Sequence, residues 1–226
     1  MSDQPCHRPT LGRLFNRLLA FVLLATLSLP AWSLGGCKRT ALGADESELN
    51  LIKRNAMPAG TEARGAIDVP DTISWRAVLA KKSDKDEPMI ISGTVFQADG
   101  TTPAPNVLIY FYHTDSDGFY GRKGEVRDRH FRGWLLTDAR GRYEISTIKP
   151  APYPNRTEAA HVHMTLTGKN FKEDSIDAIL FEGDRFITAQ DRSSAGDRGG
   201  FNPILKLEKG ADGILRGVRN IRVDKY

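Results

Sequence analysis

MIISGTVFQADGTTPAPNVLIYFYH, residues 89–113, decides the fold class of this chain. It contains two runs of β-branched and aromatic residues, 89–96 and 107–113, and the first is closed by the turn pair Asp99-Gly100. Runs of this length and composition, bounded by turn residues, are typical of β-strands. The stretch therefore predicts two strands at the centre of the fold.

Similar runs continue along the chain in both directions. Residues 134–148, WLLTDARGRYEISTI, predict a hairpin around the turn 138–141, and residues 73–79 predict a short strand or a turn of helix. Short strands at regular spacing, without a long amphipathic helix, indicate an all-β sandwich or barrel, and we expect a β-sandwich with long connecting loops. Further strands are expected over residues 161–167, 178–181, 204–207 and 218–223, the last two on either side of a turn at 209–213.

The composition is that of a globular protein. The 226 residues are 40% hydrophobic and 27% charged, with 21 Gly and 12 Pro, which excludes collagen-like and wholly disordered chains. The net charge of +4 comes from basic residues interleaved with acids rather than from a basic block, so we expect no nucleic-acid partner. Two cysteines exclude a disulfide-rich scaffold.

The N-terminus has the features of a processing signal. Arg8, Arg13 and Arg17 precede the apolar run LLAFVLLATLSL at 18–29, which is too short for a membrane span and suits a signal peptide. The following Leu34-Gly35-Gly36-Cys37 resembles a bacterial lipoprotein signal, in which the chain is cut before the cysteine and the cysteine is acylated. The alternative is an ordinary signal cleaved within 31–36.

These features predict a three-part chain. We expect a signal peptide over residues 1–36, a spacer over 37–66 with a short helix at 46–53, and a sandwich domain over 67–226. The mature protein would be exported to the cell envelope and held at the membrane only through a lipid on Cys37. Cys37 would then have no partner for an internal disulfide.

Two histidines are the best local signal for chemistry. His161 and His163 lie two positions apart in a predicted strand, so their side chains point to the same face. Neutral imidazole suits zinc, copper, iron and nickel alike. Two histidines on a plain sheet face would give the same pattern.

Two tyrosines extend this signal. Tyr153 lies in a proline-rich segment eight residues before His161, and Tyr120 follows the turn Asp117-Gly118. Each tyrosine alone is better explained as a packing residue at a turn. Taken together, two phenols and two imidazoles favour a trivalent ion, because its charge favours the ionised phenol. We therefore expect ferric iron from the type of ligand.

The motifs that carry these residues resemble a known family. DGFY at 117–120, TDARGRYEISTIKPAPYP at 137–154 and HVH at 161–163 together resemble the intradiol ring-cleavage dioxygenases, most closely the protocatechuate 3,4-dioxygenase type. The resemblance covers residues 90–185. It implies a β-sandwich with non-haem Fe(III) that opens a catechol ring with O2 to give a muconate-type diacid. A small aromatic diol and O2 would be the reactants, and a homo-oligomer is expected because the family often assembles.

The resemblance also assigns roles. It implies that Tyr120, Tyr153, His161 and His163 bind the iron. Tyr153 would leave the metal when substrate binds and take a substrate proton as a general base. The family commonly has an arginine three residues before the first histidine, where this chain has Glu158. We expect Arg156 to supply that positive charge as a catalytic residue, with Arg132 as the alternative source.

Two other functional hypotheses remain open. The chain could bind metal without cleaving rings, because a carboxylate at position 158 should repel a catecholate. Residues 92–110 and 137–148 also resemble transthyretin-like domains, which would make the protein a non-catalytic surface module. Two further histidines of the predicted domain, His113 and His130, could support the ligands but are expected on the surface, and Trp75 and Trp134 are expected to pack in the fold.

Overall fold

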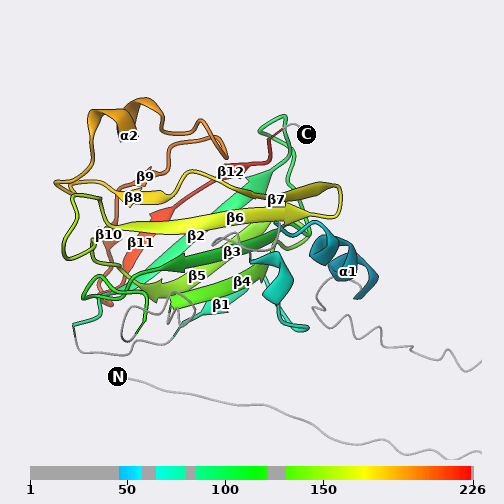
Figure 1. Cartoon of the computed structure of the whole chain (residues 1–226), viewed down its shortest axis with the longest axis horizontal. Helices are drawn as coiled ribbons and strands as arrows, with labels where there is room; N and C mark the ends of the chain where they lie inside the picture. Colours follow the sequence, from blue (N-terminus) through cyan, green and yellow to red (C-terminus); the bar gives the residue numbers. More distant parts are fainter. Residues whose placement is uncertain (1–45, 58–64, 80–84, 122–130, 225–226) are drawn as a thin grey trace, which may run out of the picture. The chain divides into compact units, whose positions relative to one another are not determined.

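The computed structural model describes residues 46–57, 65–79, 85–121 and 131–224 (Figure 1). The predicted signal peptide, most of the predicted spacer and His130 lie outside the described residues. No helix in the described part of the chain is long and apolar enough to cross a membrane. The helical elements are α1 (Glu46–Arg54), the 3-10 turn η1 (Ala66–Asp68) and α2 (Ala189–Ser193). The strands are β1 (Arg76–Val78), β2 (Pro88–Phe96), β3 (Leu108–His113), β4 (Phe131–Leu136), β5 (Arg142–Ile148), β6 (His161–Gly168), β7 (Phe171–Ser175), β8 (Ile179–Phe181), β9 (Ile204–Leu205), β10 (Glu208–Lys209), β11 (Leu215–Val218) and β12 (Ile221–Arg222).

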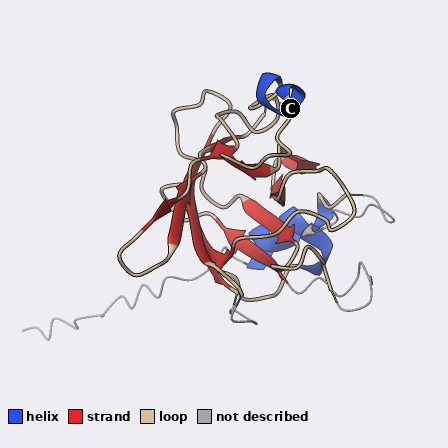
Figure 2. Ribbon diagram, turned by 90° about the vertical axis from the view of Figure 1, so that its left-hand side faces the viewer, coloured by secondary structure: helices blue, strands red, loops and turns tan. Residues whose placement is uncertain are grey.

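The strands form two six-stranded sheets, which confirms the predicted β-sandwich (Figure 2). The first sheet has the order β1-β5-β2-β11-β10, with β12 also paired to β2. The second sheet has the order β4-β3-β6-β8-β9, with β7 also paired to β6. The sequence analysis did not predict β7, β10, most of β11, the 3-10 turn η1 or the short helix α2.

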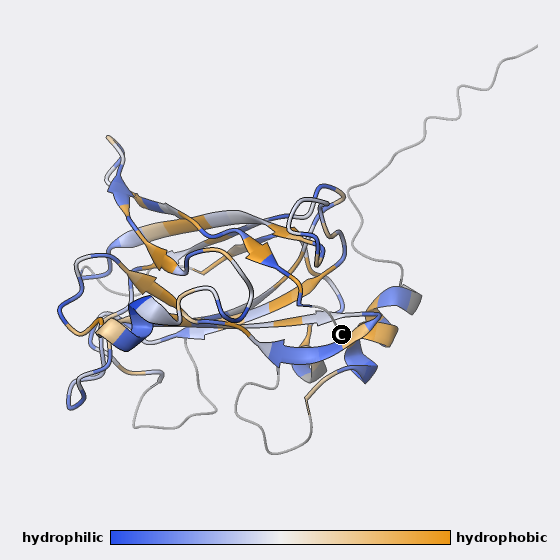
Figure 3. Cartoon of the chain, turned by 90° about the horizontal axis from the view of Figure 1, so that it is seen from above, coloured by the Kyte–Doolittle hydropathy of each residue, from blue (hydrophilic) through white to orange (hydrophobic). Residues whose placement is uncertain are grey.

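The core lies between the two sheets. The period of two along each strand sends alternate side chains inward, so Ile91 and Ile145 of the first sheet meet Phe111, Val162 and Met164 of the second. All five of these side chains are buried. Colouring by hydropathy shows the apolar segments concentrated on the strands, with hydrophilic stretches in the connections (Figure 3).

The predicted hairpin over residues 134–148 is wrong. A turn does form, because the Asp138 side chain accepts hydrogen bonds from the backbone N–H groups of Arg140 and Arg142, both at 2.9 Å. However, β4 pairs with β3 in the second sheet, whereas β5 pairs with β2 and β1 in the first. The turn therefore carries the chain from one sheet to the other. Each strand pairs instead with a strand that precedes it in the chain, β4 with β3 over six residue pairs and β5 with β2 over seven.

The expected strand over residues 218–223 is interrupted. Arg219 and Asn220 separate β11 from β12, and both short strands pair with β2. The side-chain oxygen of Asn220 accepts a hydrogen bond from the backbone N–H of Thr94 at 3.0 Å, so a side chain takes the place of a ladder partner there. The Arg219 side chain is completely buried beside Tyr143, whose hydroxyl donates to the Arg219 carbonyl at 2.6 Å.

The predicted helix at 46–53 is confirmed as α1, and it packs on the outer face of the second sheet. Ile52 and Leu49 of α1 contact a small apolar cluster with Leu108 and Leu136. The buried carboxylate of Glu173 accepts hydrogen bonds from the backbone N–H groups of Met57, Gly65 and Ala66 and from the Thr165 hydroxyl, at 2.7–3.1 Å. This part of the predicted spacer is thus attached to the sandwich by both apolar and polar contacts.

Candidate metal centre

His161 and His163 open β6 and point away from the core. Their neighbours in the strand, Val162 and Met164, face the inter-sheet core, so the two imidazoles stand on the outer face of the second sheet. The His161 Nδ1–H donates to the carbonyl of Ala159 at 2.7 Å. That bond fixes the tautomer, and it leaves the Nε2 lone pair of neutral His161 directed at the centre.

Tyr120 reaches the same place from the loop after β3. The Asp115 carboxylate accepts hydrogen bonds from the N–H groups of Asp117 and Phe119, which closes the turn that ends at Tyr120. Gly118 has a φ of +86°, and a Cβ there would come within 2.3 Å of the Pro152 carbonyl oxygen. Only glycine allows the loop to approach the 150–154 segment this closely.

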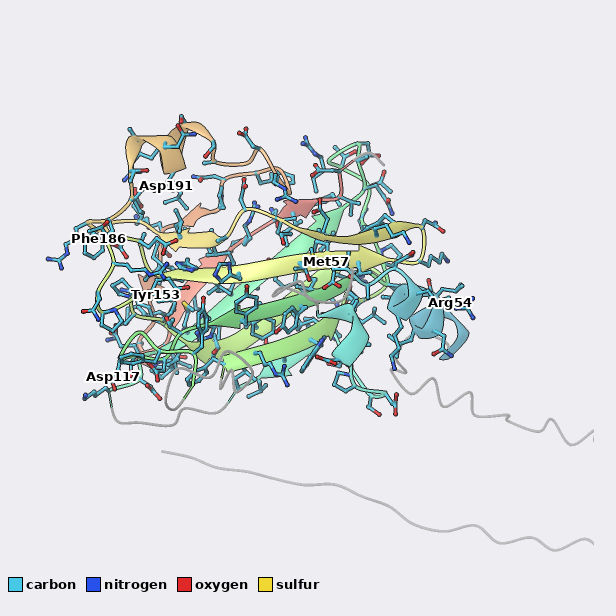
Figure 4. All side chains as sticks on the ribbon, viewed as in Figure 1. Arg54, Met57, Asp117, Tyr153, Phe186 and Asp191 are labelled. Carbon is cyan, nitrogen blue, oxygen red and sulfur yellow. The ribbon has the colours of Figure 1, made fainter. Side chains whose placement is uncertain are left out.

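Tyr153 is brought in by that proline-rich segment. The segment is tied to the loop of Tyr120 by two hydrogen bonds, from the N–H of Ala151 to the Asp115 carbonyl at 3.0 Å and from the Thr114 hydroxyl to the Ala151 carbonyl at 2.6 Å. The ring of Tyr153 lies edge-on to that of Tyr120, with the centroids 5.8 Å apart. Figure 4 shows Tyr153 toward one end of the sandwich, opposite the end that carries Arg54 of α1.

The four polar atoms form a closed ring. The hydroxyls of Tyr120 and Tyr153 share a hydrogen bond, and Tyr153 Oη lies 3.4 Å from His161 Nε2. His161 Nε2 lies 2.9 Å from His163 Nε2, which lies 3.1 Å from Tyr120 Oη. Bonds from a metal to nitrogen or oxygen are about 2.0–2.2 Å, so ligand atoms around one ion are about 2.8–3.6 Å apart. The separations that involve an imidazole nitrogen meet this requirement.

The donor set fits a hard, highly charged ion. Two phenol oxygens and two imidazole nitrogens converge from three segments of the chain, and all four side chains are half-buried. In the described part of the chain, no group of three or more His, Cys, Asp or Glu side chains is placed to hold a metal. A metal centre here therefore depends on the two tyrosines.

Tyr112, which the sequence analysis did not single out, supports the ligands. Its ring stacks on that of His163 at a centroid distance of 4.6 Å and lies 5.7 Å from the ring of Tyr120. It sits on β3 directly opposite His163 of β6 and Arg132 of β4. Periodicity in the run 107–113 predicts the face on which Tyr112 lies, but not which strand is its neighbour.

The two candidate sources of positive charge differ in position. The guanidinium of Arg156 lies 5.5 Å from the centroid of the Tyr153 ring, and it forms an ion pair with Glu158 at 3.8 Å. Arg132 is directed along β4, with its guanidinium 5.2 Å from the centroid of Trp134. Of the two, Arg156 is the one in contact with a residue of the four-atom ring.

His113 is not on the surface, as the sequence analysis expected, but fully buried between the sheets. Its Nδ1–H donates to the Thr114 carbonyl at 2.7 Å, so its Nε2 accepts the hydrogen bond from the Thr147 hydroxyl at 2.8 Å. Burial lowers the pKa of His113 to about 4, because the charged form is poorly solvated there. The side chain is therefore a neutral link between β3 and β5, separate from the metal centre.

A cavity of about 270 Å³ adjoins the two histidines. It lies between the start of β6, strand β8 and helix α2, and Phe186 and Asp191 mark its outer side at the end of the molecule that also carries Tyr153 (Figure 4). Its volume is just below the range of about 300–1,000 Å³ for small-molecule sites, so it suits a small ligand such as a single ring. Phe186 and Asp191 lie 23 to 30 residues beyond the histidines, and no local motif in the sequence indicated them.

The structure thus combines a β-sandwich of two mixed sheets with a two-tyrosine, two-histidine cluster beside a small cavity. Comparison with known proteins agrees: the Dioxygenase_C family model, described as dioxygenase, matches residues 72–212. The chain therefore belongs to the intradiol dioxygenase family, as its motifs predicted.

Its curated relatives are ring-cleaving enzymes. The chain is 30% identical over 116 residues to catechol 1,2-dioxygenase of Acinetobacter baylyi, covering 50% of this chain and 36% of that protein. It is 30% identical over 112 residues to the protocatechuate 3,4-dioxygenase beta chain of Burkholderia cepacia, covering 45% of this chain and 47% of that one. The chain thus spans less than half the length of these relatives.

Solved structures share the fold. Catechol 1,2-dioxygenase from Acinetobacter sp. ADP1 superposes with a TM-score of 0.54 at 20% identity, covering 67% of this chain and 57% of that one. The dioxygenase domain of a carbohydrate-binding fusion from Streptomyces sp. SirexAA-E superposes with a TM-score of 0.51 at 22% identity, covering 76% and 97%. These likenesses confirm the architecture of the sandwich.

Proposed function

We propose that the protein is an Fe(III) intradiol dioxygenase that opens the ring of a catechol-type aromatic with O2. Cleavage between the two hydroxylated carbons places both oxygen atoms in a muconate-type diacid. The observation that carries the proposal is the ring of four atoms from Tyr120, Tyr153, His161 and His163 beside a cavity of one-ring size. Family membership supplies the class of reaction.

In this proposal the four side chains hold the ion, and the ion when bound supplies Lewis acidity and a template for the diol. His161 and His163 are the fixed ligands, because strand β6 and the bond from His161 to Ala159 orient them. Tyr153 lies on a loop and would be the ligand able to leave the ion when a diol binds. Its phenol oxygen then accepts a proton from a catechol hydroxyl.

Arg156 supports the same step. Its guanidinium over the Tyr153 ring places a positive charge beside the group that gains and loses a proton. Because the Arg156 side chain is largely exposed, its contribution is screened by solvent and salt. We assign it an auxiliary role at this site.

The test is metal analysis with a visible spectrum, followed by O2 uptake on a panel of catechols. We expect one iron per chain, a visible tyrosinate-to-iron band and muconate formation. His163→Ala should lower the iron content, whereas Tyr153→Phe should retain iron, shift the band and reduce kcat by about 10²-fold or more, as for loss of a general base. Tyr143→Phe is the matched control, because Tyr143 lies in the core and should leave the band unchanged.

Other outcomes would replace the proposal. Iron and colour without O2 uptake on any catechol would indicate a family member that binds metal without ring cleavage. No iron after reconstitution would indicate a non-catalytic module. Full iron occupancy in His163→Ala would remove His163 from the ligand set.

We also propose that the protein is exported and anchored to the cell envelope by a lipid on Cys37. Arg8, Arg13, Arg17 and the apolar run 18–29 before Leu34-Gly35-Gly36-Cys37 support this. Expression of the full chain, followed by cell fractionation and mass spectrometry of the N-terminal peptide, tests it. A Cys37→Ser variant should lose the lipid and leave the membrane fraction, and gel filtration of the purified protein tests the expected homo-oligomer.

A further inference from the structure

The cavity beside the histidines has a charge pattern that the metal centre does not explain. His161 and His163 line the cavity on the side of the metal centre. Leu180 and Phe186 provide an apolar surface that an aromatic ring can contact. Glu158 and Asp191 also line it. Among the described residues that line the cavity, none is lysine or arginine.

The two carboxylates retain capacity to bind a ligand. One oxygen of Asp191 accepts hydrogen bonds from the backbone N–H and hydroxyl of Thr188 at 2.7 and 2.8 Å, in the cap of α2. No hydrogen bond from the described residues reaches its other oxygen. Glu158 has one ionic partner in the described part of the chain, Arg156 at 3.8 Å, and both side chains are more than half exposed. Such a pair is weak, so the negative charge of Glu158 remains available.

The aromatic wall is compatible with a cation. Phe186 lines the cavity, and the face of an aromatic ring attracts a cation. The guanidinium of Arg185 lies 4.6 Å from the centroid of this ring, so the face opposite Arg185 is the one open to a ligand cation. A ring substituent that ends in an ammonium group would meet Glu158 or Asp191 at the mouth. A substituent that ends in a carboxylate would face two like charges.

Resting on the function proposed above, we propose that this cavity selects catechols whose ring substituent ends in an ammonium group over those whose substituent ends in a carboxylate. Glu158 and Asp191 are the specificity-determining residues. A catechol with a neutral substituent should fall between the two.

Three catechols that share two saturated carbons on the ring test the order: 4-(2-aminoethyl)catechol, which ends in an ammonium group, 4-ethylcatechol, which is neutral, and 3-(3,4-dihydroxyphenyl)propionate, which ends in a carboxylate. The protein as purified is assayed by O2 uptake for kcat/KM and by calorimetric titration without O2 for Kd. An exposed charge pair changes affinity by about 2- to 5-fold, so two carboxylates should give an ammonium-to-carboxylate ratio of about tenfold. The ratio should decline with added salt.

Substitution assigns the effect to residues. Glu158→Gln should reduce the ratio, normalised to 4-ethylcatechol in the same variant, by about 2- to 5-fold. Asp191→Asn should do the same, with circular dichroism as a check on folding because Asp191 also caps α2. Glu208→Gln is the matched control, because Glu208 is exposed on β10 of the first sheet and should leave the ratio unchanged.

Equal or better binding of the propionate, or a ratio that neither variant changes, would overturn the inference. If no catechol is cleaved, the proposed function fails, whereas the order of Kd values measured without O2 still decides the selectivity of the cavity. Cleavage of 4-ethylcatechol with the opposite charge order would reject the inference and leave the proposed function intact.

Discussion

The two sheets of the sandwich differ in what covers their outer faces. On the first sheet, Val78 of β1 is 76% exposed and Val218 of β11 is 64% exposed. On the second sheet, all six residues of β3 are buried, including the outward-facing Tyr110 and Tyr112. The covering comes from α1, η1 and the loops that carry Tyr120 and Tyr153.

This difference explains where the chemistry lies. A sheet face that is covered excludes water, so polar side chains on it must pair with one another rather than with solvent. His161 and His163 do so with two phenols. On the uncovered face of the first sheet, Arg76 and Glu144 also meet, at 3.4 Å, but the pair is exposed and contributes little to stability.

Phe111→Ala should have the largest effect, because the inner core is shared by both sheets. The Phe111 ring is completely buried, and a Cβ on Gly133 would come within 2.7 Å of it, so β4 is shaped around the ring. Truncation should lower the free energy of unfolding by about 3–5 kcal/mol. Chemical denaturation measures this change. A decrease in the free energy of unfolding of less than about 1 kcal/mol would contradict close packing of Phe111 between the sheets.

Ile52→Ala should have a smaller effect, confined to the layer that covers the second sheet. Ile52 is fully buried against that sheet, and its truncation should lower the free energy of unfolding by about 2–4 kcal/mol. Because α1 packs on the outside of the second sheet and not in the inter-sheet core, much of this loss should be seen as local release of α1. Hydrogen exchange of residues 46–57 measures it.

The matched control for that variant is Val78→Ala on the uncovered first sheet, which should change stability by less than about 0.5 kcal/mol. Equal exchange in the Ile52→Ala variant and the wild type would contradict the assignment of α1 as a covering layer. An equal loss of stability in the two variants would remove the contrast between the sheets.

The sequence was sufficient to predict most of the longer strands and to single out the four side chains that the structure brings together. A period of two places His161 and His163 on one face whatever their surroundings, and the motifs around Tyr120 and Tyr153 are local. Strand pairing was harder to predict, because the 134–148 segment has a hairpin turn and its strands nevertheless join different sheets. The alternation within 107–113 likewise does not indicate whether other segments cover the outer face of the sheet. That covering layer determines whether an outward-facing residue is exposed.

His113 shows the same limitation. It continues the inward-facing series of Ile109 and Phe111 in β3, and the core position follows only once the second sheet is known to lie across it. Predicting the cavity would require contacts between residues that are even farther apart in the sequence. Glu158 precedes the histidines by a few residues, but Asp191 comes from the loop-rich region after β8, which carries no recognisable motif.

His113 also provides the smallest predicted effect, a pH-dependent link between the sheets. Its pKa is about 4 in the folded protein and about 6.5 when unfolded, so the unfolded chain takes up the proton first as the pH falls. Stability from this group is therefore present above pH 6.5 and is lost as the pH falls toward 4, by about 2 kcal/mol between pH 8 and pH 5. In His113→Asn this dependence should vanish, so the stability gap between wild type and variant should narrow by that amount over the same range. Parallel stability curves would contradict the prediction, and if the variant does not fold, NMR titration of the wild-type imidazole decides whether His113 stays neutral at pH 5.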